Sequence, residues 1–203
     1  EQTLVVGDKH RLGHLREVLR YLQEAHIRMY RMSSDLAPYL THPEMPQFHR
    51  QLEESQADLA AVGAMARALD VRLSIHPAQY IVLNSENEEV ARKAAADLVA
   101  QARILDLMGL GREAVLVVHG GSGAGGMEEA SARFVRRFRA LPAETRARLV
   151  LENDESVIAL PDTLRIHEAC GVPLVFDLLH HHVHNPGRLP AVEALQTALA
   201  TWP

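Results

Sequence analysis

The stretch Ala114-Val-Leu-Val-Val-His119, followed by the glycine-rich segment 120–126, decides the fold class of this chain. Five consecutive apolar residues predict a strand that is buried on both faces, as in a parallel sheet covered by helices. The strand ends at a histidine and a loop, and helical periodicity follows over Met127–Leu141. A strand, a loop and a helix in this order are the unit of α/β folds.

The same unit recurs on both sides of this stretch. Further strands are expected at Ile27–Met32, Val71–Ile75, Arg148–Leu151 and Leu174–Phe176. Further helices are expected at Arg11–Glu24, Phe48–Leu69, Glu86–Met108, Leu160–Ala169 and Leu189–Ala200. This alternation predicts right-handed crossovers and a parallel sheet, whereas a closed barrel needs eight strands and about 250 residues. We therefore expect a single α/β domain over 1–203, a TIM-type barrel that is incomplete, with five to six clear strands.

The bulk composition narrows the classes of function. The chain has 203 residues, a net charge of −5 and one cysteine, Cys170. This charge excludes nucleic-acid binding through overall charge alone, and a single cysteine excludes an internal disulfide. The sequence has no apolar run of 18 residues, so we expect no membrane span and a cytoplasmic monomer. The glycine segment lacks the lysine of a P-loop, so we expect no nucleotide cofactor. One expected helix carries a run of four arginines, which either contacts phosphates or forms a solvated face: Arg133, Arg136, Arg137 and Arg139.

Four apolar strands end in residues that bind metal ions. The endings read LSIH, LVVH, LVLE and LVFD, which places His76, His119, Glu152 and Asp177 at successive strand ends. In a parallel sheet these ends face one side, where active sites lie. Imidazole nitrogens and carboxylate oxygens bind Zn²⁺, Mn²⁺ or Fe²⁺. Each residue alone is better explained as the start of a loop or a helix cap, but the four together predict a metal site in which Glu152 can bridge two ions.

The histidine-rich segment after Asp177 adds a further candidate ligand. His180 lies three residues beyond Asp177, so one turn brings both near the same cavity, where each can bind a different ion. The remaining histidines of the segment are more simply solvated loop residues, and their roles stay open: His181, His182 and His184.

Two polar pairs lie just beyond the predicted strands. Asn153 and Asp154 either orient the metal ligands or form a turn. Gln79 and Tyr80 combine an amide with an aromatic ring, which suits stacking on bases or wedging between them. The alternative for Tyr80 is packing into the sheet, because the apolar segment 81–83 follows it.

Five motifs in this order resemble the UV damage endonucleases. They are YRMSSDLAPYLTHP (30–43), LSIHPAQYIVLNS (73–85), VVHGG (117–121), LEND (151–154) and FDLLHHHVHNP (176–186). The resemblance implies a TIM-barrel repair nuclease that incises duplex DNA immediately 5′ to UV photoproducts. It also implies up to three divalent ions, commonly manganese, and UV-damaged duplex DNA as the partner.

The resemblance also implies roles for single residues. His76 and His119 would bind one ion, and Glu152 would bridge it to a second ion and take part in catalysis. Asp177 would bind the second ion, and His180 the third.

Three residues away from the ions are given roles by the same resemblance. His42, in the Thr-His-Pro segment, would lie near the scissile phosphate as a second catalytic residue. Gln79 and Tyr80 would probe the lesion from within the DNA helix.

The chain departs from the family pattern at both ends. The family begins with a further strand that carries Gly-Tyr and an Asn, and it continues with strands that carry Lys-x-His, another His and a Glu. We therefore expect the first strand and the last strands of the family to be missing, and the second and third ions to lack ligands. Two alternatives stay open: a sugar isomerase or epimerase of the xylose isomerase type, and a truncated remnant that binds metal or DNA without catalysis. The low aromatic content of 4% and the Gln79–Tyr80 pair favour DNA over a sugar.

Overall fold

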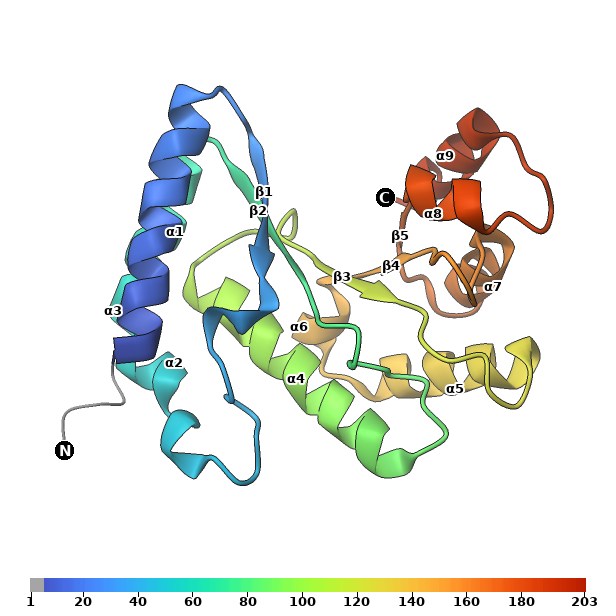
Figure 1. The fold of residues 1–203 in the computed structure, drawn as a ribbon, viewed down its shortest axis with the longest axis horizontal. Coiled ribbons are helices and arrows are strands. Elements are labelled where there is room, and N and C mark those ends of the chain that lie inside the picture. The colour runs from blue at the N-terminus through green and yellow to red at the C-terminus, as the bar shows by residue number, and fades with distance from the viewer. Residues whose placement is uncertain (1–5) are drawn as a thin grey trace. The chain divides into compact units, whose positions relative to one another are not determined.

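The computed structural model describes residues 6–203 and shows five parallel strands with helices between them (Figure 1). The strands are β1 (Met29–Ser33), β2 (Arg72–His76), β3 (Leu116–His119), β4 (Leu149–Glu152) and β5 (Leu174–Val175). The helices are α1 (Val6–Glu24), α2 (Gln51–Glu54), α3 (Gln56–Ala68), α4 (Glu88–Leu107), α5 (Met127–Ala140), α6 (Ala143–Arg146), α7 (Leu160–Cys170), α8 (Leu178–Val183) and α9 (Ala191–Leu199). Two 3-10 turns, η1 (Ser34–Leu36) and η2 (Pro46–Phe48), lie between β1 and α2.

The strands follow the order β1-β2-β3-β4-β5, so neighbours along the chain are neighbours in the sheet. Parallel register sets Ser33 opposite His76, and Glu152 opposite Val175. Within the described residues β1 and β5 are the two ends of the order, so the sheet is open. The expected α/β fold, a barrel-type sheet left incomplete after five strands, is confirmed.

The described residues divide into two compact units. The first comprises the described residues up to Pro77 together with Asp97–Leu116, and the second comprises Ala78–Ala96 together with Val117–Pro203. Both units contribute strands, and β3 begins in the first and ends in the second. The single domain expected from the sequence stays a prediction. No helix in 6–203 combines the length and apolar character that a transmembrane span requires.

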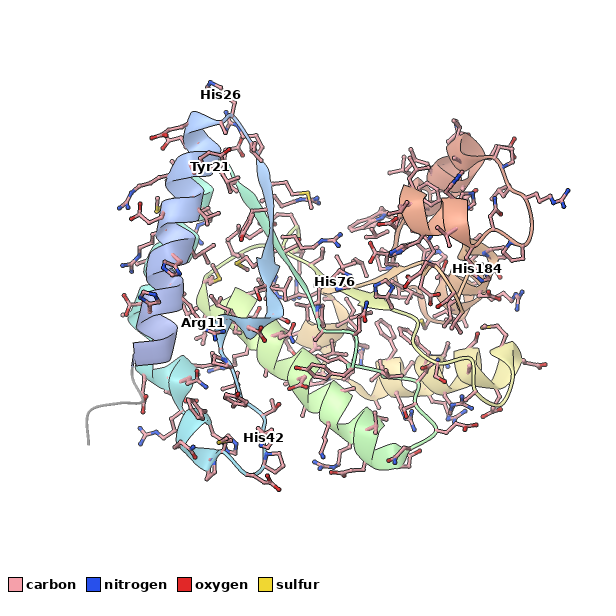
Figure 2. All side chains as sticks on the ribbon, viewed as in Figure 1. Arg11, Tyr21, His26, His42, His76 and His184 are labelled. Atoms are coloured by element: carbon pink, nitrogen blue, oxygen red, sulfur yellow. The ribbon has the colours of Figure 1, made fainter. Side chains whose placement is uncertain are left out.

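In the first unit, helix α1 packs against α3. The packed face of α1 is a buried stripe at helical spacing, formed by Leu12, Leu15, Leu19 and Leu22. Tyr21 lies on the exposed side of the same helix (Figure 2). Helix α3 also approaches the end of α4 closely, because a Cβ on Gly63 would lie 1.8 Å from the carbonyl oxygen of Met108. Only glycine allows this approach.

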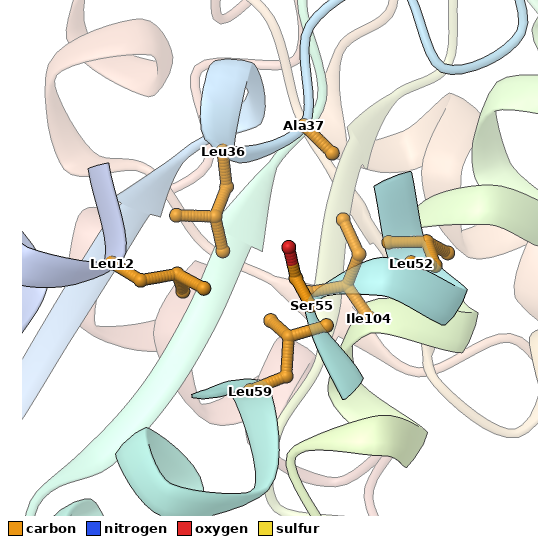
Figure 3. A pocket seen from close by; sticks show the side chains of 7 residues that line it. All are labelled: Leu12, Leu36, Ala37, Leu52, Ser55, Leu59 and Ile104. Carbon is orange, nitrogen blue, oxygen red and sulfur yellow. The ribbon is translucent and has the colours of Figure 1, made fainter. Parts of the chain in front are cut away.

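The helix expected over Phe48–Leu69 is broken at Ser55 into α2 and α3, which corrects the sequence prediction. Upstream of the break, the side-chain amide of Gln51 donates to the carbonyl oxygens of Pro38 and Phe48 at 2.7 and 2.8 Å. These contacts tie the first turn to the irregular segment before it. Ser55 lines a small apolar cavity with Leu12 and Ile104 (Figure 3). Its volume of about 10 Å³ is that of a single water at most, so it is a packing gap rather than a ligand site.

In the second unit, β4 is buried at every position and α5 packs against α7. The rings of Phe134 and Phe138 stack with their centroids 6.2 Å apart inside this layer. The outer strand β5 is covered by the segment after α9. There the indole of Trp202 donates to the carbonyl of Leu174 at 2.7 Å, and the hydroxyl of Thr201 accepts from the Leu174 N–H at 2.9 Å. Both backbone groups of this edge residue are therefore satisfied.

Burial raises the pKa of Asp97, on α4, and a hydrogen bond from the Thr41 hydroxyl opposes the shift. A carboxyl whose pKa is higher in the folded state stabilises the fold only below its unfolded pKa of about 4, and this contribution is lost as the pH rises. We therefore expect Asp97→Asn, which can still accept from Thr41, to be more stable than the wild type at pH 7. The difference should shrink towards pH 4. Urea unfolding at pH 7 and pH 4 measures this difference in stability, with substitution of the exposed Glu128 by Gln as the control. An Asp97→Asn variant that is less stable than wild type at pH 7 would contradict the prediction.

Candidate metal centre

Two predicted ligands lie together at strand ends in the second unit. His119 is the last residue of β3, and Glu152 is the last residue of β4. Glu152 is only 1% exposed, and one of its carboxylate oxygens lies 3.5 Å from His119 Nε2. The apolar residues before each donor fill the strands, so the sheet itself brings the imidazole and the carboxylate to one edge.

The spacing of this pair suits an ion between the two groups. The 3.5 Å from nitrogen to oxygen exceeds the usual length of a charge-assisted hydrogen bond, about 2.7–2.9 Å. Two ligand atoms that share an ion at about 2.1 Å in tetrahedral arrangement lie about 3.4 Å apart. A buried carboxylate is also costly unless it is paired or coordinates a metal. The residues present therefore fit a divalent cation.

His180 presents one defined ring nitrogen to the same region. Its Nδ1 lies 2.9 Å from the carbonyl oxygen of Asn153, which can only accept, so Nδ1 carries the proton and donates. In the neutral ring with this tautomer, Nε2 is the nitrogen that can bind a metal ion, and it lies 3.5 Å from a carboxylate oxygen of Glu155. The ring centroids of His180 and His119 are 5.4 Å apart. Sequence reasoning passed over Glu155, although it directly follows the Glu-Asn-Asp triplet.

Asp177 is held in place by Asn153. The Asn153 amide donates to the Asp177 carbonyl at 3.0 Å and accepts from the Asp177 N–H at 2.9 Å. One Asp177 carboxylate oxygen accepts from the His180 N–H at 2.8 Å and caps α8. The alternative of a helix cap is therefore observed. The ligand role of Asp177 stays a prediction.

Each of the two interpretations of the Asn153–Asp154 pair describes one of its residues. Asn153 is buried and orients Asp177, whereas Asp154 accepts hydrogen bonds from three consecutive backbone N–H groups, residues 156–158. Asp154 therefore shapes the loop after β4, as a turn-forming residue does. Of the three histidines with open roles, His181 is buried and lies 2.8 Å from the Leu189 carbonyl, so a solvated His181 was a wrong expectation.

Two predicted site residues belong to the first unit. His76 ends β2, and its Nδ1 lies 3.0 Å from the carbonyl oxygen of Pro77, which fixes the proton on Nδ1 (Figure 2). His42 is exposed in a turn, where its carbonyl oxygen accepts from His49 Nε2 at 2.9 Å. Its role near a phosphate stays a prediction.

Gln79 and Tyr80 lie exposed in the loop between β2 and α4. Tyr80 is 71% exposed, so the alternative in which it packs into the sheet is wrong. Ile81 and Leu83 are buried but form no strand, and they anchor the loop from below. The polar amide and the aromatic ring are thus exposed to solvent, and their role in probing a lesion stays a prediction.

Two arginines of the α5 run depart from both sequence interpretations. Arg133 is buried, and its Nε donates to the Asn84 carbonyl at 2.9 Å. Arg137 donates to the Leu83 carbonyl at 2.9 Å. These two guanidinium groups therefore hold backbone, whereas Arg136 and Arg139 are exposed.

Comparison with known proteins now adds to this geometry. The sequence profile of the UV-endonuclease UvdE family matches residues 4–203. This chain belongs to that family. It is 32% identical over 188 residues to a putative UV-damage endonuclease of Acanthamoeba polyphaga mimivirus, covering 91% of the chain and 57% of that protein. It is 30% identical over 202 residues to a UV DNA damage endonuclease of Bacillus thuringiensis subsp. konkukian, covering 100% of the chain and 63% of that protein.

Solved structures agree with the family. The crystal structure of SacUVDE matches with a TM-score of 0.83 and 34% identity, over 94% of this chain and 64% of that one. D-psicose 3-epimerase matches with a TM-score of 0.63 over 90% of this chain and 63% of that one, but at 14% identity, so this likeness shows the fold alone. The UvdE-family chain thus spans about three fifths of the length of the relatives it matches.

Proposed function

We propose that this protein is a metal-dependent DNA repair endonuclease that hydrolyses the phosphodiester bond immediately 5′ to a UV photoproduct in duplex DNA. The observation that carries the proposal is the buried Glu152 carboxylate 3.5 Å from His119 Nε2, at the strand ends of a UvdE-family chain. Neither a helix cap nor a loop start requires a buried carboxylate beside an imidazole. A divalent cation does.

The strand-end donors would hold the ions. His76, His119 and Glu152 each offer one ligand atom to a first ion. Asp177 is assigned to a second ion and His180 to a third, with manganese as the expected metal. Bound ions would polarise the phosphodiester and lower the pKa of a water molecule. They would also supply the positive charge that a chain of net charge −5 lacks.

The chain's own residues would do the remaining work. Glu152 would bind both the first and the second ion, and Asn153 keeps Asp177 in place through its two backbone hydrogen bonds. His42 is assigned to the scissile phosphate. Gln79 and Tyr80 would enter the duplex at the lesion, where damaged bases are weakly stacked and cost less to open.

Incubation of the 203-residue chain with UV-irradiated duplex and Mn²⁺ tests the function. We expect a single nick immediately 5′ to the photoproduct, none in undamaged duplex, and none in either after addition of a chelator. Damage-independent cutting, or turnover of an aldose without any nick, overturns the proposal. Binding to damaged duplex without incision at full metal occupancy also overturns it, in favour of a non-catalytic remnant.

Tyr80→Ala is expected to reduce the preference for damaged over undamaged duplex by about tenfold or more. Its exposed ring has the contact area for stacking on a base, which is worth roughly 1–3 kcal/mol. Metal binding should stay unchanged, because Tyr80 is not among the residues assigned to the ions. Competition binding with the two duplexes measures the preference. The control is Tyr21→Ala on α1, which removes a ring of similar exposure (Figure 2); equal losses in both variants count against a wedge.

A further inference from the structure

The segment that carries Gln79 and Tyr80 is held by side chains rather than by regular secondary structure. We call residues 78–87 the probe loop. Its own backbone hydrogen bonds are those of turns: from Ile81 N–H to the Ala78 carbonyl, from Val82 N–H to the Tyr80 carbonyl, and from Ser85 N–H to the Val82 carbonyl. Buried backbone carbonyls need other partners. In the probe loop these come from helix α5, which lies about fifty residues further along the chain.

Arg137 binds one stretch of the probe loop. Its Nη1 donates to the carbonyl oxygens of Leu83, at 2.9 Å, and of Ser85. Its Nη2 forms an ion pair of 2.7 Å with Glu88, at the start of α4. The planar guanidinium is suited to this work, because its donors leave in fixed directions. One side chain thus fixes two points of the loop and the start of α4.

Arg133 joins the probe loop to a second loop. Its Nε donates to the Asn84 carbonyl at 2.9 Å, and its Nη2 donates to the carbonyl of Ala124 in the glycine segment after His119. The fully buried Asn84 side chain joins the same two loops. It donates to the Ser122 carbonyl and accepts from the Ser122 N–H, both at 2.7 Å.

Close approach of the two loops also depends on glycine. Gly121 has a φ of +88°, and a Cβ there would lie 2.3 Å from Asn84 Oδ1. The glycine segment therefore allows the Asn84 contact rather than cradling a phosphate. This segment begins directly after the candidate metal ligand His119. The contacts of Arg133 and Asn84 therefore link the probe loop to the chain at the candidate metal centre.

We propose that Arg133 and Arg137 are positioning residues for lesion recognition, which clamp the probe loop so that Gln79 and Tyr80 are presented in one fixed arrangement. This inference rests on the proposed function. A wedge on a flexible loop loses conformational entropy when it enters DNA, and this loss weakens binding. A wedge on a loop that is already fixed loses less entropy and therefore binds more tightly. The clamp therefore acts on the binding of damaged duplex and not on the hydrolysis step.

Arg137→Met tests the clamp, because it keeps the aliphatic stem and removes every donor. We expect the Kd for UV-damaged duplex to rise about tenfold, with kcat at saturating DNA within about twofold of wild type. Arg137→Lys should recover part of the loss, since an ammonium group can still reach one carbonyl. Arg136→Met on the same helix, with a side chain that is 62% exposed, is the matched control and should bind as wild type does.

Hydrogen exchange of the intact chain without DNA gives a readout that is independent of activity. Arg137→Met should speed exchange at the amides of residues 78–87 and leave the strands unchanged, and Arg136→Met should change neither. If Arg137→Met folds poorly, the Lys variant is compared with wild type in both experiments. Wild-type chain without damage-specific binding overturns the proposed function and, with it, the role of the clamp. Wild-type binding together with unchanged Kd and exchange in the Arg137 variants overturns the clamp alone.

Discussion

Glu152→Gln is expected to abolish Mn²⁺-dependent incision while the metal-free variant remains folded. Glutamine keeps the size and shape of the side chain but removes the charge that binds a cation. The loss should exceed the roughly 10–100-fold that removal of an outer partner of a metal ligand costs. In the metal-free chain the glutamine fills the same buried volume as the 1% exposed glutamate, so we expect the variant to fold.

Thermal unfolding with and without Mn²⁺, beside the nicking assay, measures both halves of this expectation. Wild type should gain stability from Mn²⁺ by mass action, and the gain should vanish in Glu152→Gln. His119→Ala should lose incision in the same way. Glu128→Gln on α5 removes an exposed carboxylate and should keep both the gain and the incision. Incision by Glu152→Gln and His119→Ala at the wild-type rate would remove the metal centre from the proposal.

Strands β3 and β4 could be predicted from the sequence because each is apolar until the residue at which it ends. In β3 and β4 the first polar side chains are His119 and Glu152, and the structure ends both strands at these residues. A strand that is buried on both faces reads as a continuous apolar run, so in β3 and β4 the first polar residue marks the carboxyl edge. The same local rule that predicted the strand therefore predicted the candidate site.

The clamp could not be predicted from the sequence because its contacts are long-range. Helical periodicity sets Arg133 and Arg137 four residues apart on one face, which by itself is typical of a solvated face. Their partners, the carbonyls of Asn84 and Leu83, lie 49 and 54 residues earlier in the chain. Every residue has a backbone carbonyl, so the sequence does not show which carbonyls accept these hydrogen bonds. The break of the expected helix at Ser55 has the same cause, since it follows from the Gln51 contacts with backbone upstream.

Asn153→Leu is expected to lower Mn²⁺ affinity about 10–100-fold and the free energy of unfolding by about 1–3 kcal/mol. Leucine has a similar size and adds no charge, so any change in affinity comes from lost hydrogen bonds. The Asp177 N–H and carbonyl, which Asn153 satisfies at 2.9 and 3.0 Å, would be left without their amide partner. Asp177 would then be free to shift, and His180, whose N–H binds the Asp177 carboxylate, would shift with it.

Loss of stability alone cannot explain this result, and Asn87→Leu separates the two effects. The Asn87 amide oxygen accepts from the Glu89 N–H at 2.9 Å and caps α4 on the exposed surface. Its replacement should cost about 0.5–2 kcal/mol of stability and leave Mn²⁺ affinity unchanged. Calorimetric titration with Mn²⁺ and urea unfolding of both variants give the comparison. Equal Mn²⁺ affinity in Asn153→Leu and Asn87→Leu would mean that Asn153 supports the fold at the end of β4 and does not position a metal ligand.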